Sequence, residues 1–475
     1  MQKEQKKTIV ISSFHTLISR NILRSGVLEF LHGKVNIVIF CPQRKKDFFK
    51  REFEKDGIIV VGIPEVPLSR REQILRTAGA LLLPTSTMSL KSRAKYWREK
   101  KRIPYALSRF LYHTIARLHY TPVLFRNIFS SFYDQNIFGG FFQAYQPDLI
   151  FSTDMLDWDD IRMLVEAKRH GIKTLGMVRS WDNLTNKSLI PVAADHFLTN
   201  NDFIRNELVG LHKVRFKDIA AVGMPQFDYY IGYKPTGRKT FFEKLGFDSE
   251  RRMIMFAPMG SKFIETDWQM LQLLHDAILS GEIHGHPQLL VRIPPGDDFN
   301  KDALRLSEKV KIFFDKPGTA FQSGKRKDNE MGRGDMVHLA DSLFYADVLV
   351  NAGSSLCIDM AAFDRPVVYP DFDGGEGAPY FRSVRHFGEY HHYQYLFRHT
   401  GCKKAPSREA LIAWINTYLA TPALHREERK AFLESQCGKH DGKAHARVAS
   451  AILQLLENGF HAFSDIRMGK NKEDI

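Results

Sequence analysis

Short runs of apolar, largely β-branched residues recur along the whole chain and alternate with segments of helical periodicity. This alternation is typical of βαβ units, which build parallel sheets. Most of the runs are continuously apolar, as expected for strands that are covered by helices on both faces. The sequence therefore predicts an α/β protein with doubly wound parallel sheets. The expected strands are residues 7–13, 35–41, 58–63, 148–153, 174–180, 196–200, 219–225, 253–260, 288–295, 311–315, 347–355 and 366–372.

The strand pattern divides near residues 223–240, where Pro, Gly and Lys are frequent and a new helix-then-strand pattern begins. We place the domain boundary at Ile231. The expected domains are a Rossmann-like N-terminal domain of residues 1–231, a Rossmann-like C-terminal domain of residues 232–458 and a charged tail of residues 459–475. Doubly wound sheets bind ligands beyond the carboxyl ends of their strands. We therefore expect the two sheets to face each other across a cleft that holds the site.

A basic and aromatic stretch at about residues 85–140 interrupts the N-terminal domain. From Lys91 to Arg126 ten Lys or Arg residues stand against a single acid, Glu99, and seven aromatic residues are interleaved with them. Its pattern is helical, so we interpret it as a helical insertion. Lys, Arg and aromatic side chains act together at anionic membrane surfaces, which suggests docking there. The alternative is a helical hairpin that is merely solvated.

The formal net charge of +14 favours a polyanionic partner, such as nucleic acid, an anionic membrane or a phosphorylated substrate. No helix-turn-helix, zinc-finger or RNA-recognition pattern is present, so nucleic acid is the least favoured of these. The four cysteines form no CxxC pair, and we predict no metal site. The N-terminus lacks the apolar core of a signal peptide, and no apolar run approaches the ~20 residues of a membrane span. The expected location is cytoplasmic, with peripheral attachment to the inner face of the cell membrane as the alternative that the insertion raises.

Residues 347–373 are the most informative stretch for function. A strand ends at Asn351, the small residues 352–355 form a turn, and a new helix follows. A helix N-terminus offers unpaired N–H groups and a partial positive charge, and Gly353 allows an anion to approach closely. The hydroxyls of Ser354 and Ser355 add donors, so the turn suits a diphosphate. The alternative is that Ser354 only caps the helix.

The order of these features resembles the donor-binding half of GT-B glycosyltransferases. The resemblance extends in particular to the CDP-glycerol glycerophosphotransferases and related surface-polysaccharide transferases. It rests on the strand after Asp347, the small-Ser-Ser turn, the acid Asp359 and the Arg365-Pro366 strand that follows. It covers most of the C-terminal half and the N-terminal half in outline. The resemblance implies a GT-B fold, a nucleotide-activated sugar or CDP-glycerol as donor, a polysaccharide or lipid-linked acceptor, and no cofactor.

A second motif of that family departs from its pattern here. The family carries a basic residue in an Arg/Lys-x-His-Pro motif, and this chain has Arg292 followed by Ile293, Pro294 and Pro295. Arg292 suits a bidentate phosphate contact, although a surface ion pair is the alternative. The missing histidine argues against glycerophosphotransfer that uses it. The expected donor-binding residues are Gly260, Ser261, Arg292, His338, Gly353, Ser354, Ser355, Asp359 and Asp373.

The first half supplies candidates for the acceptor side. An inverting transferase needs a general base for the acceptor hydroxyl, and His15 lies in the loop after the first strand. Asp182 is the alternative base, because Arg179-Ser180-Trp181-Asp182-Asn183 follows the end of another strand. The acids after the strand at 148–153 are better explained as favourable helix N-terminal charges. The other expected cleft residues are Arg20, Asn21, Trp181 and Asn183.

The sequence thus predicts a transferase that moves a sugar from a nucleotide-diphosphate donor to a cell-surface polysaccharide or lipid-linked acceptor. A CDP-glycerol-type glycerophosphotransferase and a nucleotide-sugar 2-epimerase are the enzymatic alternatives. The alternatives outside catalysis are a basic nucleic-acid-binding protein and an inactive relative of the family.

Overall fold

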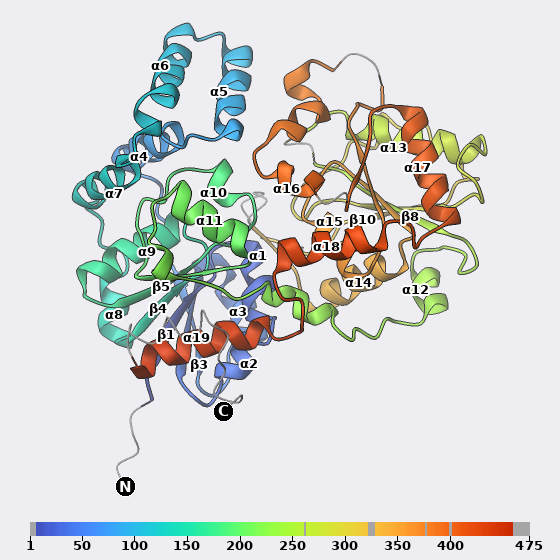
Figure 1. The fold of residues 1–475 in the computed structure, drawn as a ribbon. Coiled ribbons are helices and arrows are strands. Elements are labelled where there is room, and N and C mark those ends of the chain that lie inside the picture. The colour runs from blue at the N-terminus through green and yellow to red at the C-terminus, as the bar shows by residue number, and fades with distance from the viewer. Residues whose placement is uncertain (1–5, 261–262, 322–327, 376–377, 399–400, 459–475) are drawn as a thin grey trace. The chain divides into compact units, whose positions relative to one another are not determined.

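The computed structural model describes residues 6–260, 263–321, 328–375, 378–398 and 401–458 (Figure 1). The chain divides into two compact units. Unit 1 is Met1–Tyr229 together with Gln436–Ile475, and unit 2 is Tyr230–Ser435. The predicted tail of residues 459–475 lies outside the described residues.

Unit 1 is built on a seven-stranded parallel sheet of order β3-β2-β1-β4-β5-β6-β7. The chain winds outward from β1 in one direction, returns, and continues from β4 in the other, so the winding reverses between β1 and β4. Alternate residues of β1 are buried in different hydrophobic cores. Ile9 and Ile11 lie in one core and Val10 lies in another, so both faces of the sheet are covered. The strands are β1 Thr8–Ser12, β2 Asn36–Pro42, β3 Ile58–Ile63, β4 Leu149–Ser152, β5 Lys173–Met177, β6 His196–Thr199 and β7 Ile219–Ala221.

The helices of unit 1 include a group, α4 to α7, that lies between β3 and β4 in the sequence and whose members contact one another. In this group α5 and α6 lie side by side, and α4 contacts both α6 and α7 (Figure 1). No described helix is both long and apolar enough to cross a membrane. The helices of unit 1 are α1 Thr16–Ile18, α2 Val27–Leu31, α3 Lys46–Phe53, α4 Arg70–Leu81, α5 Ser86–Glu99, α6 Arg102–His113, α7 Thr121–Phe132, α8 Gly139–Tyr145, α9 Trp158–Arg169, α10 Asn183–Asn186, α11 Asp202–Gly210 and α19 Ala444–Asn458.

The C-terminal helix α19 belongs to unit 1, although the sequence pattern assigned residues 232–458 to the second domain. Val448, Ala449 and Ile452 of α19 are buried in the core that also holds Ile9 and Ile37. The helix therefore covers the first sheet, and α19 contacts α2. The predicted division at Ile231 lies close to the observed one after Tyr229. The predicted end of the second domain, residue 458, lies beyond the observed end at Ser435. The periodicity of a helix does not indicate which sheet the helix covers.

Unit 2 contains a six-stranded parallel sheet of order β10-β9-β8-β13-β14-β15, in which the winding reverses between β8 and β13. A separate two-stranded antiparallel pair is formed by β11 Thr319–Ala320 and β12 Asn329–Glu330. The strands of the main sheet are β8 Met253–Ala257, β9 Gln288–Arg292, β10 Ile312–Asp315, β13 Val348–Asn351, β14 Val367–Pro370 and β15 Lys403–Ala405. The helices are α12 Arg238–Lys244, α13 Asp267–Leu279, α14 Arg333–Tyr345, α15 Leu356–Ala362, α16 Tyr393–Arg398, α17 Arg408–Ala420 and α18 Arg426–Cys437.

The predicted fold class is confirmed. Every expected strand is present, and both large sheets are parallel throughout. Several strands are shorter than predicted because their last residues turn into the loops at the carboxyl edge, as after Asn351. The edge strand β15 was not predicted, because it is three residues long and carries two lysines, Lys403 and Lys404.

Candidate functional site

The turn after β13 stands at the reversal point of the unit 2 sheet, where doubly wound proteins bind ligands. It is fixed by Asn351, whose side chain is buried. The Asn351 Nδ2 donates to the carbonyl of Ala257 at the end of β8, at 2.7 Å. Its Oδ1 accepts from the backbone N–H of Gly353 at 2.9 Å and of Ser354 at 2.6 Å. One amide side chain therefore ties together the ends of the two strands that border the reversal.

Gly353 in this turn is a position that only glycine fits. Its φ is +91°, and a Cβ there would come within 2.2 Å of the ring of Tyr393. The Tyr393 hydroxyl donates to the carbonyl of Ala352 at 3.1 Å, which holds the ring against the turn. The turn is therefore closely packed on the Tyr393 side.

The three polar residues predicted after Gly353 have different surroundings. Ser355 is exposed and Ser354 is half-buried, so both are accessible to a ligand. The Ser354 hydroxyl accepts from the N–H of Leu356 at 3.3 Å. This is the kind of contact expected if Ser354 serves as a helix cap. Asp359 is buried, and its carboxylate accepts from the Tyr230 hydroxyl at 2.6 Å. The structure therefore places the Asp359 carboxylate inside the protein, on Tyr230, although Asp359 is among the expected donor-binding residues.

Arg292, at the end of β9, is buried beside Asp315 at the end of β10. The guanidinium is ion-paired with the Asp315 carboxylate. The same carboxylate has the Nε2 of His338 at 3.3 Å. Burial raises the pKa of Asp315, but the hydrogen bond from His338 and the charge of Arg292 outweigh it and hold that pKa below its usual range. Two predicted donor residues, Arg292 and His338, are thus brought together on one acid that sequence reasoning missed.

Gly260 follows β8 and lies beside two acids, Asp267 and Asp297. Its N–H donates to Asp267 at 2.9 Å, and a Cβ at Gly260 would meet the carboxylate of Asp297 at 2.3 Å. Burial raises the pKa of Asp267 to about 7, and the charges of Asp297 and Asp373 add to this effect against the backbone N–H donors. Asp373 accepts from the Val384 N–H at 3.2 Å. Its role is therefore at least partly to fix the loop after β14. Ser261 lies outside the described residues.

The raised pKa of Asp267 predicts a pH dependence of stability. The native chain keeps a proton on Asp267 that the unfolded chain loses between about pH 4 and pH 7. The contribution of this group to the free energy of unfolding therefore falls as pH rises through that window, by about 4 kcal/mol at most. Asp267→Asn is expected to flatten this fall, measured by urea unfolding across the window. Parallel pH profiles for the variant and the wild type would show the prediction to be wrong.

In unit 1 the reversal point lies between β1 and β4, and polar groups are buried at its carboxyl edge. The hydroxyls of Ser12 and Ser152 both donate to the same oxygen of Asp160, the latter at 2.8 Å. The Thr153 N–H donates to the Ser12 hydroxyl at 3.0 Å, which joins the ends of the two strands. Burial, together with the charges of Asp154 and Asp157, raises the pKa of Asp160 well above its ordinary value.

Beside this network Asp154 holds two cations. It is buried, with the guanidinium of Arg179 at 2.9 Å and the ammonium of Lys187 at 3.5 Å. Burial alone would raise the pKa of Asp154, but the charges of Arg179, Lys187 and His15 outweigh it and lower the pKa to about 2. The Asn183 amide also faces this carboxylate, at 3.4 Å. Arg179 and Lys187 bring two cations to this edge of unit 1, and a phosphate could contact them beside Asp154.

The two predicted bases are differently placed. His15 caps α1, and its Nδ1 accepts from the N–H of Leu17 at 3.2 Å. Because Nδ1 accepts this bond, a neutral His15 carries its proton on Nε2. Nδ1 can accept a proton only after its bond to the Leu17 N–H opens. Asp182 accepts from Ser180 at 2.7 Å and from Asn186 at 3.0 Å, so its carboxylate orders the loop before α10.

The predicted cleft residues occupy two places in unit 1. Trp181 and Asn183 are buried near Asp154, and Asn183 contacts it directly. Arg20 and Asn21 lie in the helical turn Ser19–Leu23 that follows α1, where Asn21 is buried and Arg20 is half-buried. Among the described residues no group of three or more His, Cys, Asp or Glu side chains is placed to hold a metal ion.

Sequence reasoning missed Asn351, Asp315 and the Asp154 cluster as parts of a site. Asn351 could have been found as the last residue of a strand at a predicted reversal point. Asp154 stands directly after a predicted strand, and the sequence gives equal reason for a helix N-terminal charge there. Its pairing with Arg179 and Lys187 depends on the packing of β4 against β5 and α10, which no local pattern reveals.

Comparison with known families shows which family the chain belongs to. The family model of CDP-Glycerol:Poly(glycerophosphate) glycerophosphotransferase matches residues 167–454, which is more than half of the chain. The chain belongs to this family. The matched residues include all of unit 2 and the Asp154 partners Arg179 and Lys187. As a member of the glycerophosphotransferase family, the protein is a transferase that uses a nucleotide-activated donor.

Solved structures share the fold of this glycerophosphotransferase family member at low sequence identity. A putative UDP-N-acetylglucosamine 2-epimerase from Listeria monocytogenes superposes with a TM-score of 0.56 at 12% identity, over 96% of this chain and 98% of that chain. The UDP-GlcNAc 2-epimerase from Neisseria meningitidis, bound to UDP-GlcNAc, gives 0.52 at 10% identity, over 95% and 100%. The wall teichoic acid polymerase TagF, as the H548A variant, gives 0.51 at 12% identity, over 96% and 90%. No curated protein matches the sequence.

Proposed function

We propose that the protein transfers a group from a nucleotide-diphosphate donor to a cell-surface polysaccharide or lipid-linked acceptor. The observation that carries the proposal is the turn after β13, where buried Asn351 joins two strand ends at the reversal point of a sheet within the matched family segment. The exposed Ser355 hydroxyl and the half-buried Ser354 border the space in which a diphosphate would lie. Donors fixed before the reaction stabilise the charge of a leaving group without reorganisation.

The transferred group has two candidates. The family match favours glycerol phosphate from CDP-glycerol. The replacement of the motif histidine by Ile293 and Pro294 favours a sugar. In this structure Arg292 is held by Asp315 with His338 on the same acid, so a histidine from α14 stands near the basic residue. This proximity supports the glycerophosphotransfer candidate despite the altered motif.

On the acceptor side we assign the phosphate contacts to Arg179 and Lys187. Asp154 would orient both cations as a positioning residue. In the reaction the acceptor oxygen forms a bond to the transferred group, the bond to the donor leaving group breaks, and the hydroxyl proton passes to a base. His15 could take this proton only after its Nδ1 leaves the Leu17 N–H. The buried acid Asp160, which accepts from Ser12 and Ser152, is assigned a structural role.

The leaving group distinguishes the candidate reactions. Transfer of glycerol phosphate breaks the diphosphate of CDP-glycerol and releases CMP, whereas transfer of a sugar releases a nucleoside diphosphate. An epimerase converts the nucleotide sugar without transferring its sugar to an acceptor. We expect CMP release from CDP-glycerol that depends on a glycerophosphate-primed acceptor and is measured by chromatography. Acceptor-dependent release of UDP from UDP-sugars instead would select the sugar transferase, and acceptor-independent conversion would overturn the transferase proposal.

The insertion supports peripheral attachment to an anionic membrane surface. Side chains of Ile103, Phe110, Leu118 and Tyr120 are exposed on and between α6 and α7. They stand among the basic residues of this stretch, and each basic residue near an anionic surface contributes on the order of 1 kcal/mol. We propose that this face of unit 1 is the one that meets the membrane.

A further inference from the structure

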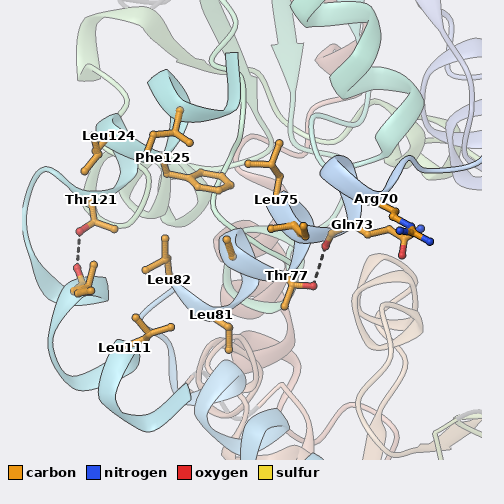
Figure 2. A pocket seen from close by; sticks show the side chains of 14 residues that line it. Arg70, Gln73, Leu75, Thr77, Leu81, Leu82, Leu111, Thr121, Leu124 and Phe125 are labelled. Carbon is orange, nitrogen blue, oxygen red and sulfur yellow. Dashed lines mark hydrogen bonds between the residues drawn. The ribbon is translucent and has the colours of Figure 1, made fainter. Parts of the chain in front are cut away.

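A cavity of about 800 Å³ lies in unit 1 between α4 and the helices α6 and α7 of the insertion (Figure 2). Its lining is mostly aliphatic and aromatic, with Arg70, Gln73, Thr77 and Thr121 as the polar residues, and Figure 2 shows Leu75, Leu82 and Phe125 around the space between the helices. Two polar residues of the lining bond to the protein itself, since the hydroxyls of Thr77 and Thr121 donate to backbone carbonyls. An apolar cavity of this kind gives ordered water few partners. It suits a hydrocarbon group.

The cavity opens on an apolar surface. Ile74 is 68% exposed and Leu124 is 59% exposed, and both line it. Contiguous exposed apolar surface marks a binding site in soluble proteins, whereas scattered apolar residues do not. A ligand that fills the cavity therefore also covers side chains that are otherwise in water.

A second hollow of about 610 Å³ adjoins the cavity and has more charged residues in its lining. Thr77 and Leu81 of α4 line both spaces, and residues of α6 also line both. The second hollow, which we call the basic groove, lies among α4, α5, α6 and α10. Its lining contains one acid, Glu99, and these cations: Arg76, Lys91, Lys95, Lys101, Arg109 and Lys187.

Most cations of the basic groove can be reached by an anion from solvent, since Arg76, Lys91, Lys95 and Lys101 are exposed. Desolvation by the surrounding protein lowers the pKa of Lys91, with Asp182 opposing and Lys187 adding to the effect. Its ammonium donates to the carbonyl of Asn186 at 2.8 Å, which fixes it at the wall of the groove. Lys101 pairs with Glu99 at 3.4 Å and Lys187 with Asp154 at 3.5 Å, and an anion in the groove would offset the positive charge of the other cations.

We propose that the cavity and the basic groove together bind a single phosphate-bearing lipid. Its hydrocarbon chain occupies the cavity and its phosphate occupies the groove. A polyanion without a chain would leave the exposed apolar lining uncovered, and an uncharged hydrocarbon would leave the cations uncompensated. Lys187 lines the groove and also contacts Asp154, so the phosphate end points to the edge of unit 1 at Asp154. That this lipid carries the acceptor rests on the proposed function, whereas its binding does not.

The binding test uses decyl phosphate below its critical micelle concentration, measured by isothermal titration calorimetry on the full chain. Inorganic phosphate and vesicles with and without phosphatidylglycerol are the comparison probes. We expect decyl phosphate to bind at least about tenfold more tightly than inorganic phosphate, because the chain adds apolar burial to the ionic contact. Binding to anionic vesicles without binding to monomeric decyl phosphate would overturn the single-lipid site and leave only surface attachment.

Two variants separate the parts of the site. Ile74→Glu in the cavity and Lys95→Glu in the groove are each expected to weaken decyl phosphate binding at least about tenfold. Ile59→Glu on β3 and Lys217→Glu after α11 make the same changes at exposed positions outside both spaces. They are expected to bind within about twofold of the unaltered chain. Equal losses in the test and control variants would refute the assignment. Nucleotide binding by unit 2 is measured separately, so its failure would refute the proposed function and leave this site standing.

Discussion

Gly353→Ala is expected to lower transferase activity by about 100-fold and to abolish binding of the nucleotide donor. The new Cβ would lie 2.2 Å from the Tyr393 ring, so the turn or the ring must move. Either movement breaks the bonds from the Gly353 and Ser354 N–H groups to Asn351. A displacement of about 1 Å in a group that positions a substrate costs about this much in rate. Activity is measured by nucleotide release, and binding by the thermal shift that the donor produces.

Gly281→Ala is the matched control in the same unit. Gly281 has a φ of +82°, and a Cβ there meets nothing within 4 Å. It follows α13 and precedes β9, at the opposite edge of the sheet from the carboxyl ends. Both alanine variants carry the left-handed backbone penalty of about 1–2 kcal/mol, but only Gly353→Ala adds the clash. If Gly353→Ala kept activity at the level of Gly281→Ala, the donor turn would be wrongly assigned.

Glu72→Gln is expected to lower the free energy of unfolding by about 3–5 kcal/mol. Glu72 of α4 and Arg162 of α9 are both buried, with two N–O distances of 2.7 and 2.8 Å between them. Removal of the charge takes away the nearer counterion of the buried Arg162 guanidinium and leaves only Asp159, at 3.5 Å, and this poorly compensated cation is the source of the cost. The Glu72 Oε2, which accepts the 2.8 Å bond from Arg162, also accepts from the Ser69 N–H at the start of α4. Urea unfolding measures the change.

The control for Glu72→Gln is Asp134→Asn, which breaks a pair made by the same helix. Arg71 of α4 and Asp134 lie 2.8 Å apart, with 63% and 51% of their side chains exposed. Exposed pairs of this kind contribute about 0–1 kcal/mol, so little change is expected. A loss below about 1 kcal/mol for Glu72→Gln as well would mean that water or a rearranged side chain reaches Arg162 in the folded state.

The sequence was sufficient for the fold because the information is local. Most of the buried parallel strands are continuous apolar runs, as in residues 58–63, and most of these runs are followed by a helical period, so both sheets could be predicted. It was insufficient where the fold depends on contacts between distant segments. Helix α19 returns to the first sheet through Val448 and Ile452, and the exposed edge strand β15 carries too few apolar residues to be recognised.

The candidate site divides in the same way. The turn at Gly353 could be predicted, because a strand followed by small residues is visible in the sequence. The orientation of Asp359 could not, since its carboxylate is set by Tyr230, which lies 129 residues away. The Asp315 contact between Arg292 and His338 and the Asp154 contact with Arg179 and Lys187 likewise arise only when neighbouring strands bring their ends together.

The most direct test of a nucleotide donor site in unit 2 is a thermal-shift titration with CDP-glycerol and with UDP-, GDP- and dTDP-linked sugars. A ligand that binds only the folded chain raises its melting temperature by mass action. We predict that at least one of these donors raises the melting temperature of the unaltered chain and of Gly281→Ala, and that it leaves Gly353→Ala unchanged. The account is contradicted if no donor produces a shift at millimolar concentration, or if the shift persists in Gly353→Ala.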